Sequence, residues 1–162
     1  MFKRREQEPD PGPSPPQTDA VLRDDLGVHQ LWYLEMRLKE ELARGSRTNG
    51  VFSLACWQLK LLPGERPSDD LLRQAAELIQ EGLRTYDILA RIDECRFVAL
   101  LLDAQYEAAS TVAFRIKGDL QVRVLSAGRW QAGVAAFPRD AVDADGLIQA
   151  SFRRLGDDAR AA

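Results

Sequence analysis

Residues 86–102 read YDILARIDECRFVALLL, and the rest of the chain is best interpreted around this segment. Two apolar runs flank the charged pair Asp93-Glu94, a pattern typical of a β-hairpin. With Asp93 and Glu94 as the two turn residues, Arg91 would face Arg96 across the strands, and like charges at that spacing are mildly destabilising. Asp-Glu is also a poor primed turn, because neither residue adopts positive φ as readily as Gly or Asn. A tip that is both charged and locally unfavourable is a candidate functional site.

Composition limits the classes of protein that the chain can belong to. Its 162 residues, 45% hydrophobic and 29% charged, suit one globular domain. A net charge of -3 and a pI near 5.3 disfavour nucleic-acid polymers as partners. No apolar run approaches the ~18 residues of a membrane span, and no secretion signal is recognisable, so we expect a cytoplasmic protein. Cys56 and Cys95 lack C-x-x-C spacing, so we expect no structural zinc.

The periodicity of apolar residues divides the rest of the chain into helices and strands. Residues 1–21 hold five of the eight prolines and predict a disordered tail, and 157–162 a second short tail. Helical spacing predicts helices over 24–47, 71–83 with Ser68 as cap, 104–117 ended by Gly118, and 143–155. Apolar runs between turn residues predict strands over 51–62, 121–125 and 129–137 beside the hairpin. We therefore expect an α/β fold with a mixed sheet of about five strands, flanked by helices, around a central hairpin.

Several strings along the chain resemble, in order and spacing, the GGDEF domain of bacterial diguanylate cyclases. They are YLE at 33–35, FSLA at 52–55, DDLL at 69–72, YD at 86–87, AR at 90–91, FVALL at 97–101 and AGVA at 132–135. The resemblance implies a fold of the nucleotidyl cyclase type, and we place a degenerate GGDEF domain at residues 22–156.

The hairpin tip departs from the family's catalytic pattern. The five positions of the Gly-Gly-Asp/Glu-Glu-Phe motif fall at Asp93, Glu94, Cys95, Arg96 and Phe97, and only the phenylalanine matches. The family's metal-binding aspartate on the first strand falls at Gln58. Mg²⁺ is held by carboxylate oxygens, and a neutral amide and a soft thiol are poor substitutes. We therefore expect no bound metal, no cofactor and no diguanylate cyclase activity.

The resemblance also implies a product-binding inhibitory site, an Arg-x-x-Asp motif six residues before the tip, joined by an arginine on the following helix. These positions hold Arg84, Asp87 and Arg115. Arginine can donate to guanine O6 and N7 or to phosphate, and a carboxylate can accept from guanine N1 and N2. We therefore predict cyclic di-GMP as the ligand. The same spacing recurs at 66–69 and 154–157, so only the offset from the hairpin gives it weight.

The leading interpretation is a catalytically inactive receptor for cyclic di-GMP that signals to an unidentified protein partner or through a homodimer. One alternative is a nucleotide-independent interaction module, in which Arg91, Asp93, Glu94 and Arg96 at the tip meet another protein. A second alternative is a vestigial pocket that holds GTP without hydrolysis. On the purely structural interpretation, Arg84 and Asp87 form an exposed ion pair worth ~0 to 1 kcal/mol.

Overall fold

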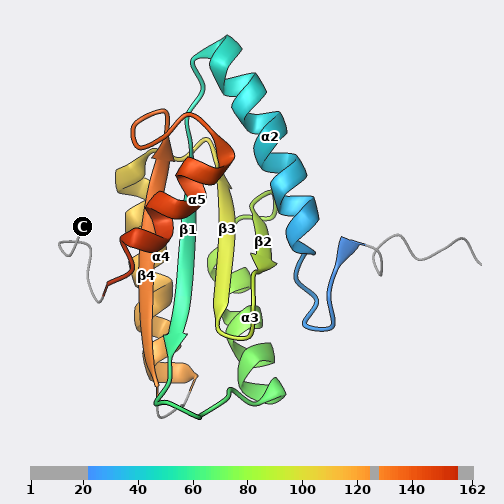
Figure 1. The fold of residues 1–162 in the computed structure, drawn as a ribbon, viewed down its shortest axis with the longest axis vertical. Helices are drawn as coiled ribbons and strands as arrows, with labels where there is room; N and C mark the ends of the chain where they lie inside the picture. Colours follow the sequence, from blue (N-terminus) through green and yellow to red (C-terminus); the bar gives the residue numbers. More distant parts are fainter. Residues whose placement is uncertain (1–21, 125–127, 157–162) are drawn as a thin grey trace, which may run out of the picture.

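The computed structural model describes residues 22–124 and 128–156 (Figure 1). The two tails predicted at 1–21 and 157–162 lie outside the described residues. The elements follow one another as α2 (Leu31–Thr48), β1 (Phe52–Lys60), α3 (Asp69–Gly82), β2 (Ile88–Arg91), β3 (Arg96–Leu102), α4 (Tyr106–Arg123), β4 (Arg129–Phe137) and α5 (Ala144–Arg153).

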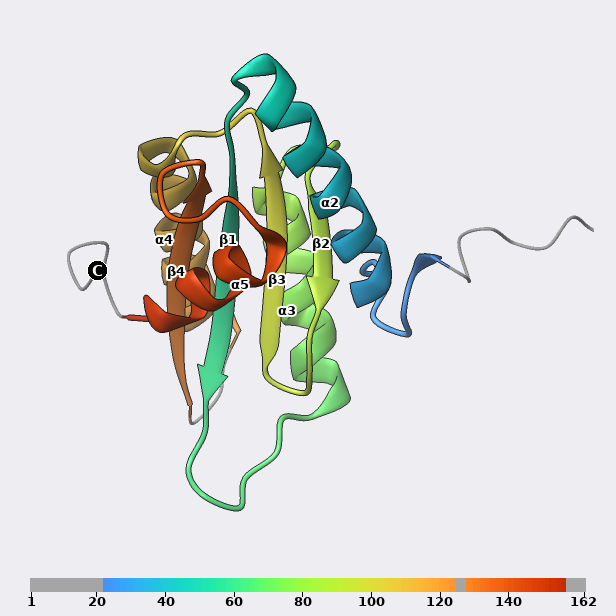
Figure 2. The same ribbon diagram turned by 45° about the horizontal axis from the view of Figure 1, so that its top comes forward.

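The strands form one sheet in the order β2-β3-β1-β4, and every neighbouring pair is antiparallel. Helices α2 and α5 cover one face, and α3 and α4 cover the other (Figures 1 and 2). A sheet that is buried on both faces needs apolar side chains at successive positions. This explains why β1 and β3 appear in the sequence as continuous apolar runs.

Each face of the sheet has its own core, anchored by aromatic side chains. On the α3 and α4 side, Trp57 and Trp130 are fully buried, and Trp57 Nε1 donates to the carbonyl of Ala113 on α4 at 3.0 Å. On the α2 and α5 side, the rings of Phe52 and Phe137 stack with centroids 4.9 Å apart. The hairpin strands contribute to both cores, with Leu89 on one face and Ile88 on the other.

The predicted α/β fold with a sheet flanked by helices around a hairpin is confirmed, but the predicted mixed pairing and the count of about five strands are wrong. Within the described part of the chain the sheet has four strands, all antiparallel. The predicted strand over 121–125 does not form, because α4 continues through Gly118 to Arg123. Buried Ile116 and Leu120 keep the helical spacing across the glycine. The β-branched residues at 122 and 124 favoured a strand, but packing outweighed that local preference.

The first helix also begins later than predicted, at Leu31 rather than at residue 24. The side chain of Asp24 accepts hydrogen bonds from the amides of Leu26 (2.9 Å) and Val28 (3.2 Å). Gly27, at φ 76°, completes this loop. Aspartate side chains that bond to nearby backbone amides offer the chain an alternative to the helix.

The hairpin is present, but its register differs from the prediction by one residue. Arg91 lies opposite Phe97, and the amide of Ile92 donates to the carbonyl of Arg96 at 2.9 Å. The tip therefore contains the three residues 93–95 instead of the two-residue turn. Arg91 does not face Arg96; it pairs instead with Asp24 at 3.3 Å. The expected repulsion between two arginines is thus absent from the hairpin.

Candidate functional site

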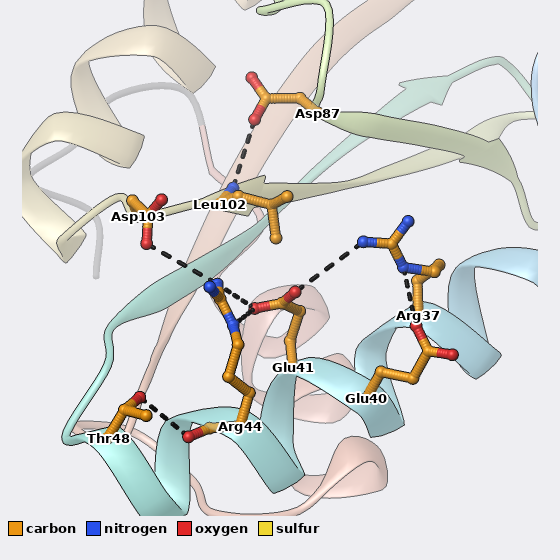
Figure 3. A network of polar contacts seen from close by, with 8 residues as sticks. All are labelled: Arg37, Glu40, Glu41, Arg44, Thr48, Asp87, Leu102 and Asp103. Atoms are coloured by element: carbon orange, nitrogen blue, oxygen red, sulfur yellow. Dashed lines mark hydrogen bonds and ion pairs between the residues drawn. The ribbon is translucent and has the colours of Figure 1, made fainter.

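The loop between α3 and β2 carries Arg84 and Asp87 and is closed by reciprocal bonds between them. The Asp87 amide donates to the carbonyl of Arg84 at 3.0 Å, and the Arg84 amide donates to Asp87 Oδ2 at 2.9 Å. Asp87 Oδ1 accepts from the amide of Leu102, at the end of β3, at 3.2 Å (Figure 3). Asp87 therefore ties the start of β2 to the end of β3 while it faces the candidate site.

One guanidinium group, that of Arg84, belongs to this loop, and a second, that of Arg115, reaches it from α4. Arg84 Nη1 donates to the Tyr86 hydroxyl at 2.9 Å, and its guanidinium lies 5.8 Å from the centre of that ring. Arg115, on α4, donates from Nη2 to the carbonyl of Gly82 at 3.1 Å. The guanidinium of Arg84 thus bonds to Tyr86, while the Asp87 carboxylate accepts hydrogen bonds from two backbone amides. This is not the simple Arg84–Asp87 surface ion pair of the structural interpretation.

The structure brings Arg84, Asp87 and Arg115 to the rim of one pocket. Its volume is about 230 Å³. The three residues share the lining with Gly82, Leu101, Leu102, Ala104, Ala108, Ala109 and Val112. Two cations, one carboxylate and an apolar wall suit a flat ring that carries polar edges and phosphate, since such pockets combine apolar contact with a few placed polar groups.

Burial sets the protonation behaviour of Asp87. It raises the pKa of the carboxyl above its ordinary value, against the hydrogen bonds from the amides of Arg84 and Leu102, which lower it. The charge of the Arg84 guanidinium also lowers the pKa. Asp87 is half-buried, so its carboxylate is held by the backbone but still reaches the pocket.

A charged network connects the far end of β3 to helix α2 (Figure 3). Glu41 is buried in α2, and its carboxylate pairs with Arg44 at 2.6 Å and with Arg37 at 3.9 Å. Arg44 also approaches Asp103 at 3.8 Å. Asp103 follows Leu102, the partner of Asp87, and has positive φ (51°). The sequence does not predict this network, because no local pattern marks a glutamate on a helix as buried.

The hairpin tip, the other candidate site, is internally paired. Arg96 Nε pairs with Asp93 Oδ2 at 2.6 Å, and its guanidinium lies 5.1 Å from the centre of the Phe152 ring. Glu94 lies 3.7 Å from Arg66. Asp93 and Glu94 are exposed, but all four side chains offered for nucleotide-independent docking already have partners, because Arg91 pairs with Asp24 and Asp25.

The positions that correspond to the family's metal ligands lie beside each other. Gln58 on β1 is opposite Arg96, and the amide of Leu59 donates to the carbonyl of Cys95 at 2.9 Å. Burial, followed by the negative charges of Asp93 and Glu94, raises the pKa of the Cys95 thiol. Across residues 22–124 and 128–156, no group of three or more His, Cys, Asp or Glu side chains could hold a metal ion.

These features define an α/β domain with an antiparallel sheet, a hairpin within that sheet and a polar pocket at the hairpin's base. The sequence model described as the diguanylate cyclase GGDEF domain matches residues 32–155. The chain belongs to the GGDEF domain family. No curated protein matches it. Among the helices that the structure describes, none is long and apolar enough to cross a membrane.

Solved structures of GGDEF domains resemble this fold closely. A sensory box/GGDEF family protein from Caulobacter crescentus has a TM-score of 0.69 at 22% identity, over 82% of this chain and 96% of that one. The GGDEF domain of DgcB from the same organism, solved with c-di-GMP, has a TM-score of 0.71 at 15% identity, over 82% of this chain and 84% of that one. SiaD from Pseudomonas aeruginosa, a diguanylate cyclase solved with its activator SiaC, has a TM-score of 0.66 at 22% identity, over 87% of this chain and 62% of that one. At these identities the likeness is one of fold.

Proposed function

We propose that this GGDEF domain is a non-catalytic receptor that binds cyclic di-GMP through Arg84, Asp87 and Arg115 and passes its bound state to a partner protein. One observation carries the proposal: these three side chains, from the α3–β2 loop and from α4, line a single pocket. Their separation in the sequence makes this convergence a property of the fold.

The chemistry of the pocket suits a guanine dinucleotide. Arginine presents a planar fork of donors that matches guanine O6 and N7 or two phosphate oxygens. An ionised carboxylate has about four acceptor positions, and Asp87 uses two of them for the amides of Arg84 and Leu102. The others can accept from guanine N1 and N2. Ala108, Ala109 and Val112 offer an apolar wall to the base.

The absence of catalysis in this proposal rests on the hairpin and its neighbour strand. Phosphoryl transfer from GTP needs metal ions that neutralise the polyphosphate, and these ions prefer carboxylate oxygens. Gln58 offers an amide, and Cys95 a thiol whose raised pKa keeps it protonated at neutral pH. Asp93 and Glu94 add negative charge at the tip, where the family's glycines would let phosphate approach the backbone.

Two of the relatives fit the two halves of the proposal. The DgcB domain was solved with c-di-GMP, which is the ligand proposed here. SiaD was solved with its activator protein SiaC, which gives a precedent for a protein partner on this fold. For the present chain both the ligand and the partner are inferences from chemistry.

The test is a calorimetric titration with cyclic di-GMP. The wild-type chain should bind it saturably, and Arg84→Ala and Arg115→Ala should each weaken binding by about tenfold or more, because each removes a charge-assisted hydrogen bond. Arg73→Ala is the matched control, since Arg73 is an exposed arginine on α3 that pairs only with nearby Asp70 in the described residues. If all three variants bind like the wild type, the site is wrong. If the wild type does not bind, the receptor role fails and the nucleotide-independent alternative becomes the better one.

A further inference from the structure

A second cavity lies on the other side of the Arg84–Asp87 loop. Its volume is about 210 Å³. Arg84 and Asp87 line both cavities, so the loop forms the wall between them. The remaining lining residues come from the segment before α2, from α3 and from the start of β2: Arg23, His29, Gln80, Leu83, Thr85 and Leu89.

We propose that this second cavity is a phosphate-binding lobe of the same site, with Arg23 and Gln80 as its donors. The proposal rests on the nucleotide binding proposed above and extends it to residues outside the Arg-x-x-Asp motif. The ligand class is a nucleotide whose base occupies the first pocket and whose phosphate crosses the Arg84–Asp87 loop.

The two donors are held in place by one backbone carbonyl. Arg23 Nη1 donates to the Gly27 carbonyl at 2.7 Å, and Gln80 Nε2 donates to the same oxygen at 3.3 Å. Gly27 has φ 76°, a left-handed conformation that favours glycine and turns the segment toward α3. A guanidinium carries five N–H donors and an amide two, so this anchoring leaves further donors for a phosphate.

The electrostatics of the lobe favour an anion. Arg23 and Arg84 bring two positive charges, and the negative charge of Asp87 is partly satisfied by two backbone amides. Burial, and then the positive charge of Arg23, lower the pKa of His29, so its imidazole stays neutral at pH 7. A neutral histidine leaves Arg23 and Arg84 as the cations that face the ligand in this part of the described chain.

The side chains that line the two cavities differ in polarity. The first pocket has an apolar wall from α4, which suits a base, whereas the second is lined mainly by polar and charged side chains, which suit phosphate. Each cavity is smaller than the ~300 Å³ at which ligand pockets of proteins begin, and the two together fall inside that range. A dinucleotide that uses both therefore fits better than one confined to either.

The test compares Arg23→Ala with wild type and with Arg73→Ala in titrations with cyclic di-GMP. Loss of one charge-assisted bond to phosphate should weaken binding about tenfold or more for Arg23→Ala, and Arg23→Lys, which keeps the charge, should recover part of it. Because Arg23 is exposed, the difference from wild type should shrink at high salt, which screens surface charges. A structural role for Arg23 would not produce that salt dependence.

Gln80→Leu provides a second variant, which removes the amide donor and its bond to the Gly27 carbonyl but leaves the bond from Arg23 to that carbonyl in place. It should also weaken binding, and thermal melts should confirm that each variant is folded. If Arg23→Ala and Gln80→Leu bind like wild type while Arg84→Ala is impaired, the second lobe is wrong and the receptor function stands. If the folded wild-type chain does not bind cyclic di-GMP, both proposals fall.

Discussion

Asp87 has two tasks in one side chain. Both of its oxygens accept hydrogen bonds from backbone amides, and the same carboxylate lines the two cavities. A residue that holds the loop and faces the ligand is a poor choice for a binding test, because its removal changes the fold and the site together. The side chains of Arg84 and Arg115 are exposed, and their truncation leaves the backbone bonds of the Arg84–Asp87 loop in place, so they report binding more cleanly.

We predict that Asp87→Ala destabilises the protein by about 1–3 kcal/mol, because it leaves the amides of Arg84 and Leu102 without their acceptor. Asp87→Asn, whose amide oxygen can replace one of the two, should cost less. Urea denaturation measures both changes. Asp119→Ala, at an exposed aspartate on α4, is the control and should change stability by less than about 0.5 kcal/mol. Equal stability of Asp87→Ala and Asp119→Ala would contradict this role.

The local chemistry of the tip explains an error of one residue in the predicted hairpin register. The Asp93 side chain accepts from the amide of Cys95 at 2.9 Å and from Arg96 Nε at 2.6 Å. Such bonds build a turn around aspartate, and they draw Cys95 into the tip. The apolar pattern could predict two paired strands, but it could not predict which side chain would close the loop between them.

At the scale of the hairpin, we predict no cyclase activity. Purified protein incubated with GTP and Mg²⁺ or Mn²⁺ should yield no cyclic di-GMP, because Gln58 and Cys95 are poor ligands for hard cations. Product analysis by chromatography measures this, with an active diguanylate cyclase as the positive control. Robust turnover by the wild-type chain would mean that other groups hold the metal.

The end of β4 is joined to α5 by a buried carboxylate. Asp140 accepts from Arg154 Nη2 at 2.8 Å and from the amide of Ala136 at 2.7 Å. Arg154 also donates from Nη1 to the carbonyl of Val134 at 3.1 Å. Burial alone would raise the pKa of Asp140, but the bond from Arg154 and the bond from Ala136 outweigh it, so the pKa lies below its ordinary value.

This pKa gives stability a defined dependence on pH. Because the folded-state pKa of Asp140 is depressed, its contribution is present above the unfolded value near 3.8 and is lost as pH falls through the folded value. We predict that Asp140→Asn lowers the free energy of unfolding by about 1–3 kcal/mol at pH 7. The difference in stability between this variant and wild type should narrow as the pH falls below 3.8. Chemical denaturation across this range measures it. A gap that stays constant down to pH 2 would contradict the assignment.

For the whole molecule, the sequence predicted the helices and the central hairpin better than the sheet. Ser68 does cap α3, accepting from the amide of Leu71 at 3.2 Å, as its position before Asp69-Asp70 predicted. The strand predicted over 121–125 is absent, because α4 continues through this segment and buries Leu120 at helical spacing. Strand pairing depends on contacts between distant segments, which no single window of sequence contains.

The site was predicted only in part, for the same reason. The offset from the hairpin singled out Arg84, Asp87 and Arg115, and the fold places them around one pocket. Arg23 and Gln80 are 57 residues apart in the sequence and carry no motif. They meet because the loop that contains Asp24 and Gly27 folds back against α3, where the side chains of Arg23 and Gln80 both donate to the Gly27 carbonyl. Sequence can find residues at a fixed distance from a motif, but tertiary packing alone reveals the others.

Binding of cyclic di-GMP by the intact chain is what the proposed receptor function requires, and titration of the folded wild-type protein measures this directly. We predict saturable binding that Arg84→Ala and Arg115→Ala weaken by about tenfold or more and that Arg73→Ala leaves unchanged. Absence of measurable binding by a wild-type chain with a cooperative melt would contradict the central claim.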